Sequence, residues 1–256
     1  MSLPRGRRVP LSPARRLVAE LMRACRGIPT VTIERRLALG DLVAARRELP
    51  VRPMWTAIVA KAFALVAAEM PVLRRSYISF PWAHLYEHAG SVAGVVVERE
   101  CGGERTVFVA QVRRPDATPL AEIDAFLREC KDAPVESIRR FRRAMRLARL
   151  PMPFRRLGIW LGLHASGRLR ERHAGTFGLT SPAAAGAGMV QLITALTATL
   201  HYGLFDPDGR LDMRMTFDHR VLDGAEAARA LVALERVLRG PILDELRAPS
   251  KNILTG

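Results

Sequence analysis

The stretch MTFDHRVLDGAEAARALVALERVL, residues 215–238, combines a candidate catalytic group with a clear helical pattern. His219 lies between two aspartates, Asp218 and Asp223, at the end of a strand-like segment. After Gly224 the apolar residues recur at helical spacing, which predicts a helix for the rest of the stretch. A histidine at such a turn can transfer protons near neutral pH, because its unperturbed pKa is about 6.5. Spacing alone, however, favours a structural histidine over a catalytic one.

Length and composition indicate a globular chain. It has 256 residues, 49% of them hydrophobic, which is enough for one large domain or two small ones. Its cysteines, at positions 25, 101 and 130, form no C-x-x-C pair and are odd in number, which argues against a disulfide framework and favours a reducing compartment. The basic N-terminus lacks the apolar core of a signal peptide, and no apolar run is long enough to span a membrane. We therefore expect a cytoplasmic protein.

Local patterns predict a chain that mixes helices with hairpins. Glycine-rich turns join the expected strands in two places, and Thr118 is a candidate N-cap. Helices are expected at 11–25, 39–49, 54–70, 118–130 and 225–238, and strands at 30–39, 90–99, 105–114, 193–205 and 209–217. This order predicts an α/β fold, a mixed and mostly antiparallel sheet covered by helices. We expect one domain over 1–256, with an N-terminal arm at 1–10 and a polar C-terminal tail at 244–256.

The segment DHRVLDG (218–224) resembles the D-H-R-x-x-D-G signature of the acyltransferase catalytic domain of 2-oxo-acid dehydrogenase complexes. Other stretches resemble the same family in the same order: VPLSPARRLVAELM its opening helix, residues 88–123 its central hairpin, and GTFGLTS its G-T-F-T-I-S segment. LHYGLFDPDGRLDMRMTF then matches the last hairpin, so the resemblance covers about 9–243. It implies a two-layer sandwich like that of chloramphenicol acetyltransferase.

The resemblance also implies roles for individual residues. His219 would be the general base that removes a proton from a thiol or hydroxyl, which then attacks an acyl thioester. Asp223 would hold the site together by pairing with Arg15, and Asp218 and Gly224 would support it. Thr180 stands where the family has a serine that donates to the oxyanion, a contact worth about 100-fold or more in rate. The neighbouring Ser181 is an alternative donor, and a strand-end hydrogen bond is the plain structural interpretation of both.

In the resembled family the site lies between subunits of a trimer, so the resemblance implies a homotrimer or a larger assembly. Coenzyme A or its acyl thioester would be a substrate, with a thiol, hydroxyl or amine as acceptor, and no permanently bound cofactor or metal is expected. The chain shows no lipoyl or partner-binding domain, which favours a stand-alone acyl-CoA transferase. The competing hypothesis is a non-catalytic trimeric scaffold that binds a membrane or a protein.

An arginine-rich amphipathic insertion, 139–173, is the largest departure from that family. Residues 139–172 hold eleven Arg and one Glu, a net charge of +10 out of +15 for the whole chain. Aromatic and aliphatic residues among these arginines are typical of helices at an anionic membrane surface. Contact with coenzyme A phosphates and a simply solvated arginine face are the alternatives, and no fold signature supports nucleic-acid binding. The remaining histidines (84, 88, 164, 173 and 201) show no metal-ligand spacing.

Overall fold

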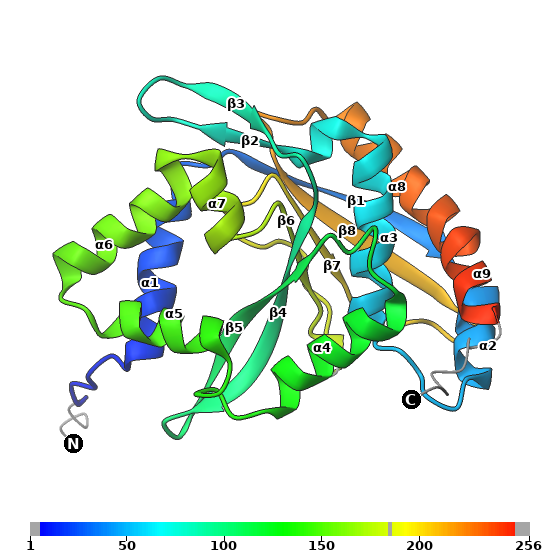
Figure 1. Cartoon of the computed structure of the whole chain (residues 1–256), viewed down its shortest axis with the longest axis horizontal. Coiled ribbons are helices and arrows are strands. Elements are labelled where there is room, and N and C mark those ends of the chain that lie inside the picture. Colours follow the sequence, from blue (N-terminus) through cyan, green and yellow to red (C-terminus); the bar gives the residue numbers. More distant parts are fainter. Residues whose placement is uncertain (1–5, 184–185, 249–256) are drawn as a thin grey trace, which may run out of the picture.

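A six-stranded sheet forms the centre of the molecule in this computed structural model, which describes residues 6–183 and 186–248 (Figure 1). The strands run in the spatial order β1-β8-β7-β6-β4-β5. The β6 strand is parallel to both of its neighbours, and the other three pairings are antiparallel. The strands are β1 (Thr30–Ala38), β4 (Val92–Cys101), β5 (Glu104–Arg113), β6 (Phe177–Thr180), β7 (Ala198–Tyr202) and β8 (Arg210–Asp218).

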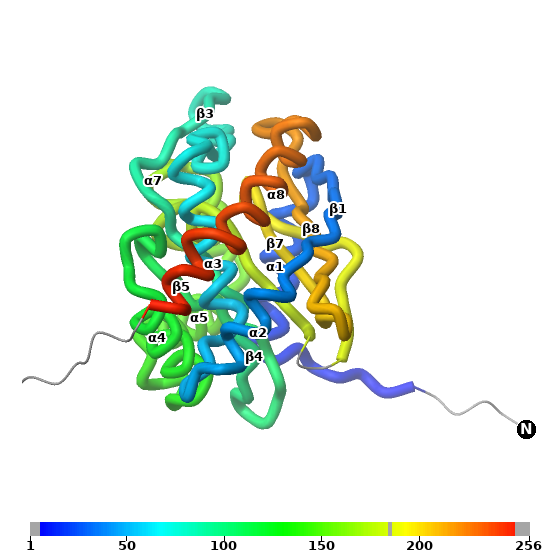
Figure 2. The backbone as a smooth tube through the Cα atoms, turned by 90° about the vertical axis from the view of Figure 1, so that its right-hand side faces the viewer, coloured from blue at the N-terminus to red at the C-terminus, as the bar shows by residue number. Residues whose placement is uncertain are grey.

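Helices cover this sheet and enclose the main core. Figure 2 looks onto α8 and shows α3 beside it. The α3 sequence is apolar almost all round, as expected of a helix buried on most sides, and its Phe63 meets Phe177 of β6 at a ring-centroid distance of 4.9 Å. The helices on this side are α2 (Gly40–Glu48), α3 (Trp55–Glu69), α4 (Leu120–Asp132), α8 (Gly224–Arg239) and α9 (Pro241–Arg247).

A second group of helices lies beside β4 and β5 (Figure 1). It contains the N-terminal helix α1 (Pro13–Cys25), which is capped by Ser12, and most of the arginine-rich insertion. The helix α1 contacts both α5 and α6. The insertion folds into α5 (Arg139–Arg149), α6 (Met152–Trp160), the π-helical turn η2 (Leu161–Ala165) and α7 (Gly167–His173).

A small hairpin forms a separate two-stranded sheet that the sequence patterns did not predict. It consists of β2 (Arg75–Ile78) and β3 (His84–Glu87), entered through the 3-10 turn η1 (Pro71–Arg74). Strands of four residues carry too little alternation to be recognised from sequence. The hairpin packs against η2 and so joins the inserted helices to the sheet.

The expected α/β sandwich with a mostly antiparallel sheet is confirmed, and two details are corrected. Thr118 does not cap α4; its hydroxyl donates to the Arg114 carbonyl, and Pro119 precedes the helix. The predicted tail at 244–256 begins too early, because α9 continues to Arg247 and buries Ile242 and Leu246 against the core. Residues 249–256 of that tail, and 1–5 of the predicted arm, lie outside the described residues.

Candidate active site

His219 lies on the exposed turn directly after β8. Its backbone N–H donates to the Pro29 carbonyl at 2.9 Å, which extends the β1–β8 ladder by one residue. Its side chain is 48% exposed, with the ring 5.7 Å from that of Phe217. Within the part of the chain that the structure describes, no side-chain hydrogen bond to the imidazole is found. The ring is thus held by its backbone and remains open to an outside partner, as a general base requires.

Asp223 caps the following helix. It forms a capping box with Glu226, whose carboxylate accepts from the Asp223 N–H at 3.1 Å. Its own carboxylate lies 3.7 Å from Nδ1 of His219, too far for a hydrogen bond, and is 79% exposed. Gly224 opens α8 without a positive φ, and a Cβ there would meet nothing within 4 Å. Neither residue is held by tight packing inside one chain.

The expected pairing of Asp223 with Arg15 is wrong for the contacts of one chain. Arg15 lies in the first turn of α1, and its Nε donates to Glu104 of the β4–β5 hairpin at 2.9 Å. Both side chains are substantially exposed. The N-terminal helix packs with the inserted helices α5 and α6, so its arginine reaches the hairpin instead of the His219 turn.

Asp218 holds the His219 turn from its buried side. Its side chain is fully buried and accepts from Arg220 through Nε at 2.9 Å and Nη2 at 2.7 Å, a bidentate arrangement. Its backbone N–H donates to Thr197, which joins the turn to the loop before β7. Arg220 in turn lies 4.1 Å from the ring centroid of Tyr77, and hydrogen bonding to Asp218 raises its pKa. The residue before His219 is therefore tied directly to the loop before β7 and, through Arg220, to β2.

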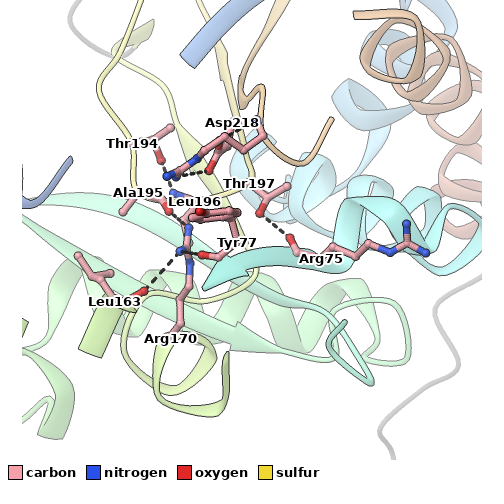
Figure 3. A network of polar contacts seen from close by, with 10 residues as sticks. Arg75, Tyr77, Leu163, Arg170, Thr194, Ala195, Leu196, Thr197 and Asp218 are labelled. Atoms are coloured by element: carbon pink, nitrogen blue, oxygen red, sulfur yellow. Dashed lines mark hydrogen bonds and ion pairs between the residues drawn. The ribbon is translucent and has the colours of Figure 1, made fainter. Parts of the chain in front are cut away.

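Arg170 is a second buried cation beneath this turn, and no sequence motif pointed to its role (Figure 3). It is 1% exposed, and its guanidinium donates to three main-chain carbonyls: those of Tyr77, Leu163 and Ala195. Burial lowers its pKa to about 10, an effect that nearby Asp218 opposes, so it remains charged near neutral pH. Carbonyl acceptors carry no sequence signature, which explains why motifs missed a residue that joins β2, η2 and the 194–197 loop.

Thr180 ends β6, and Ser181 follows it. The Ser181 hydroxyl donates to the Tyr202 carbonyl at 3.0 Å and accepts from the Ala183 N–H at 3.3 Å. A strand-end hydrogen bond was the plain structural interpretation of Thr180 and Ser181, and Ser181 makes such a bond. For the half-buried Thr180, no hydroxyl partner is found among residues 6–183 and 186–248. Of the two candidates, Thr180 has the hydroxyl that is available to a ligand.

The sheet register separates Thr180 from His219. Thr180 is level with His201 on β7, and His201 is level with Arg214 on β8. His219 comes five residues after Arg214 along β8 and its turn. At about 3.3 Å per residue, the two side chains lie on the order of 15 Å apart along the sheet, as well as two strands apart across it. One chain therefore presents the predicted base and the predicted oxyanion donor at opposite ends of its sheet.

A neutral polar network supports the Thr180 end. His201 is fully buried; its Nδ1 faces the Met189 carbonyl at 3.2 Å and its Nε2 faces the Thr216 hydroxyl at 3.1 Å. Thr216 continues the chain to Thr32 on β1 at 2.8 Å. A carbonyl accepts only, so Nδ1 carries a proton and donates it to the Met189 carbonyl. Burial lowers the pKa of His201, which favours the neutral ring.

Ser76, His88 and Glu171 are connected like a nucleophile–base–acid triad. The Ser76 hydroxyl lies 3.0 Å from Nε2 of His88, and Nδ1 lies 3.0 Å from Glu171. Ser76 and His88 are each 1% exposed, however, so no substrate reaches the hydroxyl. The contacts instead join the β2–β3 hairpin to α7, and burial lowers the pKa of His88.

The paired hollows of the surface lie away from His219 and Thr180, and the described residues contain neither a metal-ligand cluster nor a membrane-spanning helix. Two shallow hollows run along α8, near Val232 and Arg236, and neither includes His219 or Thr180. Searching the described ranges for three or more His, Cys, Asp or Glu side chains that could hold a metal ion finds none. None of the helices at 6–183 and 186–248 is long and apolar enough to cross a membrane.

Comparison with known proteins identifies the fold. The sequence matches no protein-family model and no curated protein. Among solved structures, the dihydrolipoamide acetyltransferase of Azotobacter vinelandii has a TM-score of 0.65 at 19% identity, over 93% of this chain and 94% of that one. The cubic core of a pyruvate dehydrogenase multienzyme complex gives 0.63 at 19% identity, with 93% and 94% coverage. Chloramphenicol acetyltransferase gives 0.54 at 14% identity, with 86% and 94% coverage. The chain thus shares the fold of these acyltransferase cores, and the fold expected from the resemblance is confirmed.

Proposed function

We propose that this protein is an acyltransferase that moves an acyl group between coenzyme A and a thiol, hydroxyl or amine acceptor. The observation that carries the proposal is the pair of half-sites on the sheet. An exposed histidine whose backbone is hydrogen-bonded lies at one end, and a hydroxyl with no partner among the described residues lies at the other. The fold is one that solved acetyltransferases share. In the Azotobacter acetyltransferase, a histidine and an asparagine with roles in the catalytic mechanism are four positions apart, as are His219 and Asp223.

In the proposed reaction His219 acts as general base. Its unprotonated nitrogen removes the proton from the acceptor, a thiol for example, and the resulting thiolate attacks the thioester carbonyl of acyl-CoA. The tetrahedral oxyanion accepts a hydrogen bond from the Thr180 hydroxyl of a neighbouring subunit. Collapse of this intermediate breaks the bond to the coenzyme A sulfur, which leaves as a thiolate and takes the proton back from His219. The acyl group is transferred without net oxidation or reduction.

The separation of the half-sites leads us to propose a cyclic homotrimer, or an assembly built from trimers. An oxyanion donor must lie within about 3 Å of the reacting oxygen, and the general base within similar reach of the acceptor. A distance on the order of 15 Å along one sheet excludes that arrangement within one chain. A head-to-tail contact between copies brings unlike surfaces together and can close into a ring. Each interface would then pair His219 of one subunit with Thr180 of the next.

Mixed assemblies test both parts of the proposal. A suitable first assay uses acetyl-CoA with dihydrolipoamide as acceptor and measures the release of the coenzyme A thiol. Alone, His219→Ala should lose activity by about 10³-fold and Thr180→Val by about 100-fold. Subunits of the two kinds, mixed by co-expression, should regain about a quarter of wild-type activity, because about a quarter of the interfaces then carry both intact residues. No recovery on mixing would contradict a shared site. Full activity of both single variants would remove these residues from the site, whereas no coenzyme A release by the wild type with a panel of acyl-CoAs would favour the non-catalytic scaffold.

A further inference from the structure

The outer side of α6 is an apolar surface. Exposed hydrophobic side chains recur there at helical spacing: Met152, Phe154, Leu157 and Trp160, followed by Leu161 at the start of η2. Phe154 is 63% exposed, although a phenylalanine is a residue that folding normally buries. The polar residues Arg155 and Arg156 lie on the inner side of the helix, toward Glu20 of α1. The apolar side chains of α6 are thus mostly exposed, while Arg155 is buried and Arg156 is partly exposed.

The tip of the β2–β3 hairpin extends this apolar surface. Phe80 contacts Trp160 edge-to-face, with ring centroids 5.6 Å apart. Trp82, at the same tip, is 81% exposed. Two elements far apart in the sequence thus contribute aromatic side chains to one region of the surface. Exposed apolar residues gathered in this way indicate a binding site more than scattered single ones do.

Unpaired arginines line the neighbouring helix α5. Its exposed charged residues are all positive: Arg139, Arg142, Arg143, Arg146 and Arg149. In the described ranges none of these five makes an ion pair, and neither α5 nor α6 contains an acidic residue. Like charges three or four positions apart repel one another on a helix, so this row weakens α5 unless something neutralises it. Folding of the chain therefore gives no reason for the row, whereas an anionic partner does.

The two helices that carry these surfaces are neighbours. The helix α1 contacts both α5 and α6, and α5 and α6 also contact each other (Figure 1). Glu20 of α1 pairs with the two α6 arginines and with none of the five exposed α5 arginines. The apolar row and the arginine row therefore lie on adjacent helices. We call the combination of the α6 row, the hairpin tip and the α5 arginines the basic-aromatic face.

We propose that the basic-aromatic face binds the surface of an anionic membrane. Arginines would contact the lipid phosphates, while the aromatic and aliphatic side chains of α6 and the hairpin tip would enter the region between headgroups and acyl chains. Nucleic acid would satisfy the arginines but would leave Phe154 and Leu157 in water. Two copies meeting through this same face would bring both arginine rows together. Lipid satisfies both halves of the surface.

Vesicle co-sedimentation of the full-length protein tests the proposal. We expect binding to phosphatidylcholine vesicles that contain about one third phosphatidylglycerol, and much weaker binding to phosphatidylcholine alone. Trp82 and Trp160 should report insertion by a blue shift of their fluorescence, which a Trp82→Phe, Trp160→Phe double variant should lose. Arg142→Gln, Arg143→Gln and Arg146→Gln together should lower the partition coefficient on the order of 100-fold. Phe154→Ser with Leu157→Ser should lower it by about tenfold or more.

Matched controls come from the α2–α8 side of the molecule. Arg47→Gln, Arg229→Gln and Arg239→Gln together remove the same charge from exposed positions, and Val51→Ser with Val232→Ser removes exposed apolar groups. Both controls should bind vesicles like the wild type, with unchanged circular dichroism in every variant.

Equal loss of vesicle binding in the controls, or no vesicle binding by the wild type, would overturn the proposal. DNA binding that needs the arginines but not Phe154 and Leu157, without vesicle binding, would assign the face to nucleic acid. A change of oligomeric state in the Phe154, Leu157 variant would assign it to another copy of the chain. The proposal is independent of acyl transfer, so His219→Ala should bind vesicles normally.

Discussion

The two ends of the β7–β8 pair are supported by different chemistry. At the His219 end, buried charges hold the turn: Asp218 with Arg220, and Arg170 with three carbonyls. At the Thr180 end, the side chains of His201 and Thr216 are joined, while Arg214 donates to the same Met189 carbonyl as His201 and pairs with Glu34. The exposed turn has little packing to position it, so buried charge-assisted bonds serve that purpose, whereas the strand end combines buried neutral hydrogen bonds with a partly exposed ion pair. Each end leaves one functional side chain without a hydrogen-bond partner among the described residues of its own chain.

The largest expected effect comes from removing the ring at the exposed end. His219→Ala should lower kcat for acyl transfer by about 10³-fold, within the range that general base catalysis contributes. Release of coenzyme A thiol measures it. The exposed ring makes no side-chain hydrogen bond among the described residues, so the melting temperature should not change. Activity near that of the wild type would remove His219 from the mechanism.

The Thr180 end should show a smaller loss of rate. Thr180→Val keeps the shape of the side chain but removes the hydroxyl, which should cost about 100-fold in kcat. Thr180→Ser restores the donor and should retain most activity. Ser181→Ala is the matched control: its hydroxyl bonds to Tyr202, so its loss should affect stability more than kcat. The reverse order of effects would make Ser181 the donor.

Sequence patterns predicted the long elements of this fold and failed where the signals were short or non-local. Helices such as α3 and α8 carry many apolar residues at one period, so their existence and approximate ends were recognisable. The four-residue strands β2 and β3 offered no such pattern. The motif around His219 identified the turn, but the turn's support by Arg170 depends on carbonyls that any residue provides. Within one chain Arg15 pairs with Glu104 and not with Asp223, because a family motif does not specify such long-range contacts.

The two aspartates of the motif should differ in their contribution to stability. Asp218→Asn should lower the free energy of unfolding by about 2–4 kcal/mol, because Arg220 loses its carboxylate in a mostly buried setting. Asp223→Asn should change it by less than about 0.5 kcal/mol, since asparagine is an equally good N-cap and the carboxylate is exposed. Urea denaturation of both variants measures the difference. Equal losses would mean that Asp223 has a buried partner in the assembled protein.

The smallest expected effect is a change in the pH dependence of stability that comes from His201, at the Thr180 end. Burial lowers the pKa of His201 in the folded chain below its unfolded value of about 6.5. Between the two values the unfolded chain binds a proton that the native chain does not, so the free energy of unfolding falls as the pH falls from about 6.5 toward the lowered folded pKa. His201→Gln should remove this contribution and flatten the slope below pH 6.5 by up to about 1 kcal/mol per pH unit. Urea unfolding of His201→Gln and of the wild type at a series of pH values measures both slopes. An unchanged slope in His201→Gln would mean that burial of this ring does not contribute to the pH dependence of stability.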